Sequence, residues 1–554
     1  MTRSRSNSFM SVVNDAEKPQ ALVDLNREAA AATNAELSMT LLEGIKKYPY
    51  AVGWSVFLST CIVMEGFDKS LINSLFALGP FQKKYGVLQA DGSYQLTAAW
   101  QSGLSNASLV GEICGLWLNG IFAEKYGYRK TIIGSLILVA AFIFIPFFAN
   151  SLPQIIAGQI LLGFPWGVFQ TITTTYAAEV CPVALRAYLT TYVNLCWVLG
   201  QLLAAGVLRG ISNMTSEWAV RIPFACQWFW PVPLAIGIAF APDSPWWMIR
   251  NDRPEEAKRA LQRLTNNSDD SSNVNIDETI AMMQHTNLLE KTHSAGTSYI
   301  DCFKRTDLRR TEVACVVWMI QTLCGSTFMG YSTYFFEQAG LSRSASFSMS
   351  LALYGLGAIG TISSWFLMTK FGRRGLYLSG QAIMLVVLLV IGLLGLISKH
   401  NTGAQWAIGS LLLVFTFTYD ATVGPVCYSL VAELSSNRLR AKTVVLARIF
   451  YNITGLITNI LTPRMLNPTA WDWGAKTGFF WVGSISLCIV WTYFRLPEPK
   501  GRTYGELDVL FEQKVPARKF SSTFVNQFGE GAGGAADAGF LPEKEAVAVR
   551  VEQI

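Results

Sequence analysis

The chain has 554 residues, of which 51% are hydrophobic and only 15% are charged, whereas soluble domains carry about 25% charged residues. A soluble protein of this length needs more charge to cover its surface, so the composition excludes that class and indicates a helical protein that crosses a membrane many times. The net charge of +6, without a basic stripe, argues against nucleic-acid binding, and the 3 histidines all lie outside apolar runs, which argues against a histidine-based metal or catalytic centre.

The two ends of the chain are polar. Residues 1–45 contain no apolar core that would make a signal peptide, so we expect a disordered cytoplasmic tail there. Residues 497–554 include the run GEGAGGAADAG and predict a second cytoplasmic tail, largely disordered. No nucleophile–base set or phosphate-binding loop occurs in the inner segments, so we expect neither an enzyme nor a cofactor.

Between the tails, apolar segments recur, each close to the length of about 20 residues that a membrane-spanning helix needs. They lie at 49–77, 98–122, 131–150, 154–178, 188–210, 222–241, 311–337, 345–368, 376–397, 404–432, 443–464 and 477–495. The predicted fold class is therefore an all-α integral membrane protein with 12 transmembrane helices in two six-helix halves, at 46–241 and 311–496. The polar insert between the halves, 242–310, carries RPEEAKRALQRL and predicts an intracellular helical domain.

Two pairs of motifs recur at matching places in the two halves. EKYGYRK follows the second span and TKFGRRG the eighth, while AEVCPVALRA follows the fourth and AELSSNRLRA the tenth. Homologous six-helix halves are typical of transporters, which bind their substrate between the halves near the bilayer midplane. The basic loops fall on one side, so the positive-inside rule places that side and both termini in the cytoplasm.

Three loop motifs resemble those of sugar porters of the major facilitator superfamily. They are GIFAEKYGYRK, PDSPWWMIR and PEPKGRTYGELDVLF, and the resemblance covers about 48–515. Two longer stretches, which begin EGFDKSLINSLF (65–76) and PWGVFQTITTTY (165–176), are similar to the fungal α-glucoside, or maltose-type, proton symporters.

The resemblance implies proton-coupled uptake of a disaccharide, an α-glucoside such as maltose or sucrose, across the plasma membrane by alternating access. The partners are then a sugar, a proton and the lipid bilayer, and we expect a monomer. Two alternatives stay open: a transporter or transceptor for a β-linked disaccharide such as lactose or cellobiose, and a passive sugar facilitator.

The resemblance also assigns charged residues of the inner loops to a cytoplasmic latch, whose salt bridges form when the inner side closes. These gating residues are Glu124, Arg129, Glu179, Arg186, Arg373, Glu433 and Arg440. From the residues alone, the basic ones could serve only to set the topology. Thr369 stands where an aspartate is usual, so we expect an asymmetric latch.

A sugar site needs amides and hydroxyls for the rim of the ring and aromatic planes for its C–H face. Residues of these kinds match family positions and are our candidates for substrate binding: Asn194, Gln201, Gln321, Thr322, Thr327, Tyr331 and Tyr428. Thr322 and Thr327 replace amides that are usual in monosaccharide porters, which favours space for a second ring. Helix–helix hydrogen bonding and packing are the alternative roles of such residues.

Ionisable residues inside spans cost about 2.5–3.5 kcal/mol each on insertion scales and usually have a function. The candidates for proton coupling are Glu65, Asp68, Glu112 and Arg448. Glu65 and Asp68 are three residues apart and share a helix face, so they resist joint ionisation. Asp68 matches the first-helix aspartate of proton-coupled sugar porters, but Gln159 stands where their arginine partner is usual. We expect Arg448 or Lys69 to balance Asp68; a static buried ion pair is the alternative.

Overall fold

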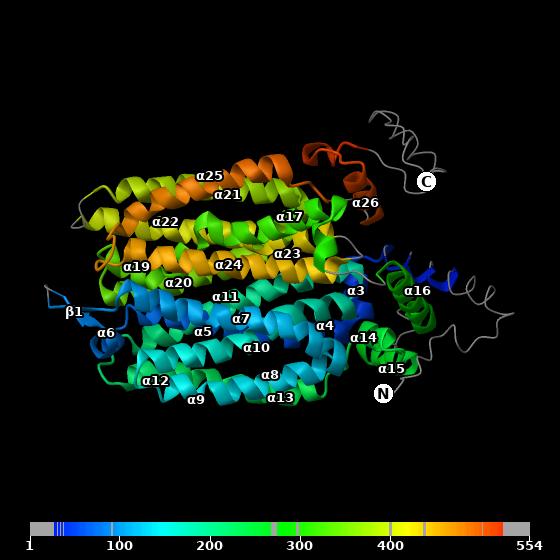
Figure 1. The fold of residues 1–554 in the computed structure, drawn as a ribbon, viewed down its shortest axis with the longest axis horizontal. Helices are drawn as coiled ribbons and strands as arrows, with labels where there is room; N and C mark the ends of the chain where they lie inside the picture. The colour runs from blue at the N-terminus through cyan, green and yellow to red at the C-terminus, as the bar shows by residue number, and fades with distance from the viewer. Residues whose placement is uncertain are drawn as a thin grey trace. The chain divides into compact units, whose positions relative to one another are not determined.

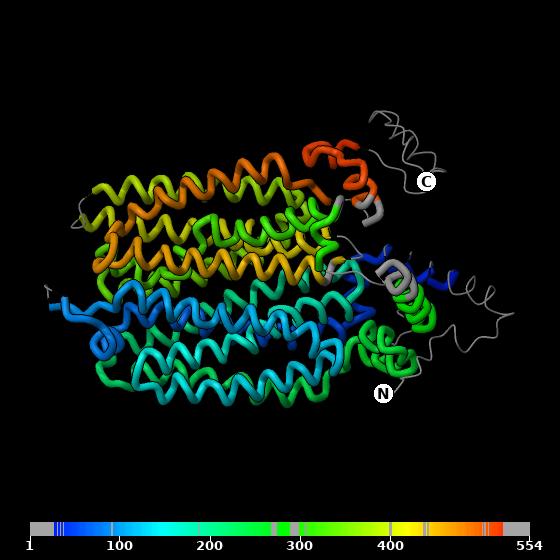
Figure 2. Tube along the Cα trace, viewed as in Figure 1, coloured from blue at the N-terminus to red at the C-terminus, as the bar shows by residue number. Residues whose placement is uncertain are grey.

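The computed structural model describes residues 27–523 except for short gaps (Figure 2). The gaps are residues 30, 34, 37, 90–91, 267–273, 295–298, 398–400, 436–438, 501 and 503. Most of the two expected disordered tails, residues 1–26 and 524–554, therefore lies outside the described residues. The described chain is helical, apart from one short antiparallel hairpin of β1 (Val87–Leu88) and β2 (Tyr94–Gln95).

Contacts divide the chain into two compact units. Unit 1 comprises residues 1–72, 107–204 and 214–296, and unit 2 comprises 73–106, 205–213 and 297–554. These units differ from the predicted halves, because 73–106 of the first half belongs to unit 2. Side-chain hydrogen bonds account for this: the Asn73 amide donates to the Gly330 carbonyl at 3.4 Å, and the Asn467 amide to the Leu96 carbonyl at 2.7 Å.

Eleven helical segments of the described chain are long and apolar enough to cross a membrane. They are Pro49–Leu75, Tyr128–Phe147, Leu152–Val180, Val183–Ile211, Trp218–Ala239, Asp307–Gly330, Arg343–Phe371, Arg373–Leu394, Thr402–Leu434, Lys442–Leu466 and Gly474–Arg495. The remaining expected span is α7 (Ala98–Tyr126), which has 29 residues. Gln101 and Glu112 make it less apolar, but both side chains are fully buried by neighbouring helices.

Unit 1 contains the helices of the first half, apart from their residues within 73–106 and 205–213, and the three helices of the insert that follow them. The first set is α4 (Pro49–Ser59), α5 (Cys61–Leu75), α7, α8 (Tyr128–Phe142), α9 (Phe144–Phe147), α10 (Leu152–Val180), α11 (Val183–Ile211), α12 (Trp218–Cys226), η1 (Gln227–Phe229) and α13 (Pro231–Ala239). The insert forms α14 (Pro245–Arg250), α15 (Pro254–Leu264) and α16 (Ile276–Ser294). Figure 1 shows these three at the end of unit 1 where α4 begins.

Glycines bring α7 and α10 into backbone contact. A Cβ atom on Gly111 would lie 2.0 Å from the Ile160 carbonyl oxygen, and one on Gly163 would lie 2.1 Å from the Ser108 carbonyl oxygen. Small residues permit such close helix approach in membranes. Gln170 lies seven residues after Gly163 and so on the same face of α10, which turns its amide towards α7.

Unit 2 contains the helices of the second half and the described part of the C-terminal region. They are α17 (Arg305–Gln321), η4 (Thr322–Ser326), α18 (Thr327–Gly330), α19 (Ser332–Gln338), α20 (Arg343–Phe371), α21 (Arg373–Leu394), α22 (Thr402–Ala421), α23 (Val423–Leu434), α24 (Arg440–Leu466), α25 (Thr477–Arg495) and α26 (Tyr504–Glu512). Short turns η3 (Tyr299–Phe303), η6 (Gly474–Lys476) and η7 (Ala517–Lys519) and the helix α6 (Gly79–Tyr85) complete it.

Two of the expected spans in unit 2 are interrupted helices. Gly325 has φ +99°, which breaks the helix between α17 and α18. Thr422, with φ −131° and ψ −80°, separates α22 from α23, just before Gly424 and Pro425. Substrate sites of transporters are typically formed by such discontinuous helices, because the broken backbone exposes polar groups at membrane depth.

Helices also occur inside the two regions expected to be tails. α3 (Leu41–Lys47) begins with a capping box, in which the Thr40 side chain accepts from the Glu43 N–H and the Glu43 carboxylate accepts from the Thr40 N–H. The sequence signature T-x-x-E predicts that a helix starts at this position, but we did not expect a helix there. α26 likewise lies within 497–554, where we expected little structure.

Candidate functional site

One lysine joins two buried carboxylates in unit 1. The Lys69 ammonium lies 2.9 Å from Glu65 Oε1, one helical turn earlier on α5, and 2.8 Å from Glu112 Oε1 on α7. Both glutamate side chains are fully buried, and that of Lys69 is 14% exposed. One ammonium balances only one of the two carboxylates, so the triad carries a net charge of −1 when all three side chains are ionised.

Gln170 of α10 donates hydrogen bonds to both carboxylates of the triad. Its amide donates to Glu65 Oε1 and to Glu112 Oε2, the latter at 3.1 Å. Glu65 Oε2 is buried and has no hydrogen-bond partner among the described residues. The sequence predicted roles for Glu65 and Glu112 but not for Gln170, because a lone glutamine in a span gives no signal of its partner.

Asp68 is also fully buried in unit 1, and it is held by amides. Its Oδ1 accepts from Gln159 Nε2 at 3.2 Å and from Gln227 Nε2 at 2.7 Å. Oδ2 is buried without a hydrogen-bond partner in the described part of the chain. Gln159 therefore contacts Asp68 as a neutral donor, at the position where the resemblance to proton-coupled sugar porters implies an arginine. Gln227 was not expected from the sequence.

Arg448 lies among aromatic rings of unit 2. Its guanidinium carbon is 4.5 Å from the Trp318 ring centroid and 4.6 Å from that of Tyr451, and its side chain is buried. Such cation–π contacts stabilise a desolvated guanidinium by about 2 kcal/mol. Since Lys69 binds Glu65 and Glu112, and Arg448 belongs to the other unit, the choice between these two cations as the partner of Asp68 stays a prediction.

The predicted sugar residues of unit 2 divide into two groups. Gln321 donates to the Gly424 carbonyl at 2.8 Å, and Thr322 donates to the Met319 carbonyl at 2.9 Å, so both are engaged in holding helices. Thr327 Oγ1 donates to Thr458 Oγ1 on α24 at 3.0 Å. This group shows the helix-bonding role that we weighed as the alternative.

The two tyrosines form the second group. Tyr331 stacks on Phe76, with ring centroids 6.1 Å apart, and its hydroxyl is buried without a hydrogen-bond partner among the described residues. Tyr428 packs edge-on against Trp318 at 4.8 Å, beside Arg448. An aromatic plane and a hydroxyl that lacks a protein partner are features that a sugar ring can use.

The sugar candidates of unit 1 share a helix face with Trp197, a ring that contacts the acidic triad. Asn194 and Gln201 are buried on α11, seven residues apart, and Trp197 lies between them on the same face. The Lys69 ammonium is 5.1 Å from the Trp197 ring centroid. Trp197 thus links the candidate sugar face of α11 to the charged residues of α5.

The latch acids pair with arginines inside their own units. Glu179 accepts from Arg250 at 2.8 Å and from the Tyr128 hydroxyl at 3.0 Å, and the Ser244 hydroxyl also donates to it. Glu433 accepts from Arg373 at 2.8 Å. Arg250 was not expected from the sequence.

The other gating candidates have different environments. Glu124 is exposed, the Arg129 guanidinium donates to the Ala239 and Ala241 carbonyls at 3.5 Å, and Arg186 Nε is buried without a hydrogen-bond partner in the described chain. The Arg440 side chain lies outside the described residues. A latch that closes between the halves stays a prediction.

Each of the two repeated basic loops is bound by an acidic residue from another motif. Asp243 Oδ1 accepts from the Tyr128 N–H at 3.1 Å, at the start of α8, where Gly127 has φ +84°. Glu498 accepts from the Arg373 and Arg374 N–H groups at 3.0 and 2.9 Å, at the start of α21. Burial raises the pKa of Asp243, although the N–H groups around it oppose this.

Comparison with known proteins agrees with this architecture. A family model described as "Sugar (and other) transporter" matches residues 54–511. The general alpha-glucoside permease of Saccharomyces cerevisiae is 44% identical over 509 residues, which cover 91% of this chain and 82% of the permease. The maltose permease MAL31 of the same organism is 41% identical over 536 residues, which cover 96% of this chain and 87% of the permease.

A solved structure shares the fold. The proton:xylose symporter XylE, bound to 6-bromo-6-deoxy-D-glucose, aligns with a TM-score of 0.69 at 18% identity, over 84% of this chain and 99% of that one. At this identity the likeness shows the fold alone, and it confirms the predicted fold class. With the family match and the relatives, it establishes that the chain belongs to the sugar (and other) transporter family, as a sugar porter of the major facilitator superfamily.

Proposed function

We propose that this protein imports an α-glucoside disaccharide together with protons by alternating access. The names of the relatives, alpha-glucoside and maltose permeases, support the cargo. The observation that carries the proposal is the contact of Lys69 with the Trp197 ring, because it joins a proton-accepting triad to the candidate sugar face of α11. A sugar that packs on this face would meet the charges that respond to protons.

Asp68 and the triad would carry the proton. The amides of Gln159 and Gln227 hold Asp68 Oδ1, which leaves the buried Oδ2 to receive a proton. A protonated Asp68 removes one negative charge from a site that excludes water. With Asp68 protonated and sugar bound, the protein can then change conformation without keeping an uncompensated charge at a buried position, which would be costly.

The candidate sugar residues of each unit supply one of the two kinds of group that a sugar needs. Asn194 and Gln201 supply donors and acceptors for ring hydroxyls, and Tyr331 and Tyr428 supply planes for the C–H face. Gln321 and Thr327 bond to the neighbouring helices α23 and α24, and Thr322 bonds to the end of α17, so we assign the three residues a supporting role around the break at Gly325.

The membrane setting follows from the helices and the relatives. The protein is a multi-pass membrane protein, and we propose that it acts in the plasma membrane as a monomer with both termini in the cytoplasm. The basic inner loops support this orientation through the positive-inside rule.

One experiment tests cargo and coupling together. Cells that express the protein receive labelled maltose, sucrose, trehalose, lactose, cellobiose or glucose, while sugar uptake and external pH are recorded. We expect maltose or sucrose uptake with a rise of external pH. Uptake without a pH change would make the protein a passive facilitator, and uptake only of lactose or cellobiose would make it a carrier of β-linked disaccharides. A sugar-induced cellular response without uptake would indicate a sensor.

A further inference from the structure

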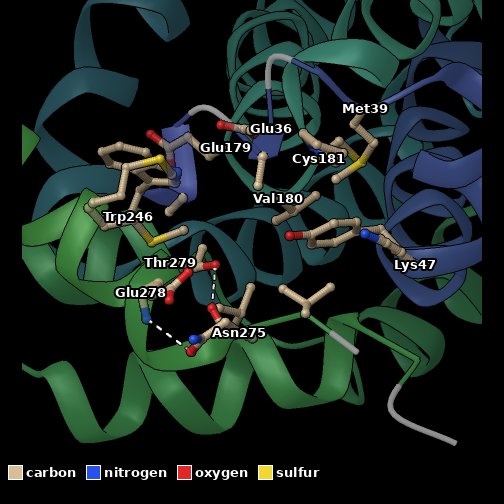
Figure 3. Close-up of a pocket in the computed structure, with 18 of the residues that line it drawn as sticks. Glu36, Met39, Lys47, Glu179, Val180, Cys181, Trp246, Asn275, Glu278 and Thr279 are labelled. Carbon is tan, nitrogen blue, oxygen red and sulfur yellow. Dashed lines mark hydrogen bonds between the residues drawn. The ribbon is translucent and has the colours of Figure 1, made fainter. Parts of the chain in front are cut away.

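A cavity of about 250 Å³ lies in unit 1 between the N-terminal segment and the insert helices. Glu36 and Met39 of that segment form one wall, and Asn275 and Thr279, at the start of α16, face them (Figure 3). None of the sugar candidates lines this cavity, but the latch residues Glu179 and Arg186 do. The N-terminal segment, meaning the described residues between Arg27 and Tyr48, thus covers part of the predicted latch.

Three contacts hold the N-terminal segment in place. Glu36 Oε1 accepts from the Val183 N–H, at the first residue of α11, at 3.1 Å. Gly44 faces Leu185 so closely that a Cβ atom there would lie 3.1 Å from Leu185 Cγ. The Lys47 carbonyl accepts from the Asn266 N–H, just after α15, at 2.9 Å. The segment is therefore tied to both a membrane helix and the insert.

Glu36 is the charged residue of this attachment. The start of a helix offers unsatisfied N–H groups and a partial positive charge, which a carboxylate stabilises. Burial raises the pKa of Glu36, and the attraction of Arg186 and the Val183 N–H opposes this only in part. The other charged or titratable groups that line the cavity are Lys47, Tyr48, Glu179, Cys181, Arg186 and Glu278.

The sign of the pH effect follows from linkage. A carboxyl whose pKa is higher in the docked segment than in the free one binds a proton more readily when docked, so acid favours docking. The bond to Val183 survives protonation, because the carbonyl oxygen of a neutral carboxyl still accepts. Docking weakens as the pH rises through the raised pKa and the buried group ionises.

We propose that the N-terminal segment is a regulatory strap, docked on the start of α11 through Glu36, which covers the latch residues Glu179 and Arg186 and docks more tightly as the cytosol acidifies. The regulatory part rests on the proposed function: each sugar imported brings a proton into the cell. Acidification would then favour the docked strap, disfavour the latch and slow further import. The strap would protect the cell from an acid load.

Docking is tested by hydrogen exchange of the purified full-length protein, in mildly acidic and mildly alkaline buffers, with correction for the intrinsic pH dependence of exchange. We expect the amides of α3 to exchange more slowly in acid in the wild type. Glu36→Gln should keep slow exchange in both buffers, because its amide oxygen still accepts from Val183. Glu36→Ala should exchange about fivefold faster, as expected for loss of one hydrogen bond.

Glu28→Gln is the matched control, since Glu28 is an exposed acid of the same segment, and it should behave as the wild type. Two results would overturn the docking role of Glu36. One is that the α3 amides of Glu36→Ala exchange at the wild-type rate, and the other is that their exchange in Glu36→Gln depends on pH as it does in the wild type.

Regulation is tested by the initial rate of maltose uptake at clamped cytosolic pH. Uptake by the wild type should fall as the cytosol is acidified, Glu36→Ala should stay fast, and Glu36→Gln should stay slow. Equal pH profiles in all three would overturn the regulatory role, even if exchange shows docking. A wild type that takes up none of the sugars would instead contradict the proposed function, and the exchange result would still decide whether the strap docks.

Discussion

At the scale of single residues, the acidic groups of unit 1 differ in what balances them. Glu65 and Glu112 share the Lys69 ammonium, whereas Asp68 is met by the neutral amides of Gln159 and Gln227. Hydrogen bonds from amides stabilise a carboxylate less than an arginine does, so protonation of Asp68 loses less favourable interaction. We therefore expect Asp68 to bind and release a proton more readily than the triad.

Replacement of Asp68 tests its role as the carrier. Asp68→Asn keeps the size and an acceptor oxygen but cannot change its charge. We expect it to abolish accumulation of sugar against a gradient while sugar exchange persists, as measured with labelled maltose in cells and in counterflow. Asp277→Asn, at a side chain that is 73% exposed on the insert, should be unaffected. External alkalinisation on sugar addition to Asp68→Asn cells would contradict the assignment.

Replacement of Lys69 tests the charge balance of the triad. Lys69→Met leaves two buried carboxylates without their ammonium, and removal of one partner from a buried ion pair costs about 3–5 kcal/mol. Glu112→Gln instead leaves one ammonium with one carboxylate and should cost little. Thermal unfolding of the purified proteins in detergent measures both. A Glu112→Gln protein as unstable as Lys69→Met would contradict this account.

At the scale of elements, the break at Gly325 lies among supporting residues and just before a candidate sugar ligand. The turn at Gly325 ends α17, where Gln321 binds the Gly424 carbonyl, and begins α18, where Thr327 binds Thr458. Tyr331 follows directly, with its hydroxyl buried. The interruption thus sets the direction of α18, and Tyr331 follows at the end of this helix.

The Gly325 break is tested by alanine. At φ +99° an L-residue is strained by about 1–2 kcal/mol, whereas the added methyl meets only ordinary contacts, the nearest being Trp481 Cγ at 3.4 Å. Gly325→Ala should lower the midpoint of thermal unfolding and the apparent affinity for sugar. Gly206→Ala is the control, since its Cβ would meet only Leu351 at 3.9 Å, at a helical position. Equal stability of the two variants would argue against strain at Gly325.

At the scale of the whole molecule, the repeated basic loops of the two units are bound in the same way, by a carboxylate that accepts backbone N–H groups. Asp243 and Glu498, from motifs that follow the last span of each half, each accept backbone N–H groups at the start of a helix that follows a positive-φ glycine. The repetition was visible in the sequence as two similar loops. Asp243 and Glu498 lie in two of the sugar-porter motifs, but the sequence did not predict that they bind these loops.

The orientation of the whole chain is tested by epitope access. An epitope at the N-terminus and another at the C-terminus should be reached by antibodies only after the plasma membrane is permeabilised, because the basic loops hold that side in the cytoplasm. An epitope inserted between Gln89 and Tyr94, next to the β1–β2 hairpin, should be reached in intact cells. Staining of either terminus in intact cells would contradict the orientation.

The sequence by itself determined the class of protein, most of its spans, their six-plus-six order and the buried charges worth testing. These features depend on the length of apolar runs and on which residues interrupt them, and both are local properties. The sequence also placed Glu65 and Asp68 on one face of a helix, which is a helix-neighbour relation.

Only the tertiary structure decided which groups meet. Asp68 is bound by glutamines 91 and 159 residues further along the chain, and Lys69 by Glu112, 43 residues away. Such pairings depend on how helices pack, as at Gly111 and Gly163, and no local pattern specifies them. The same holds for the proposed strap. Glu36 lies in a polar segment, and no local pattern predicts its contact with the start of α11, 147 residues away.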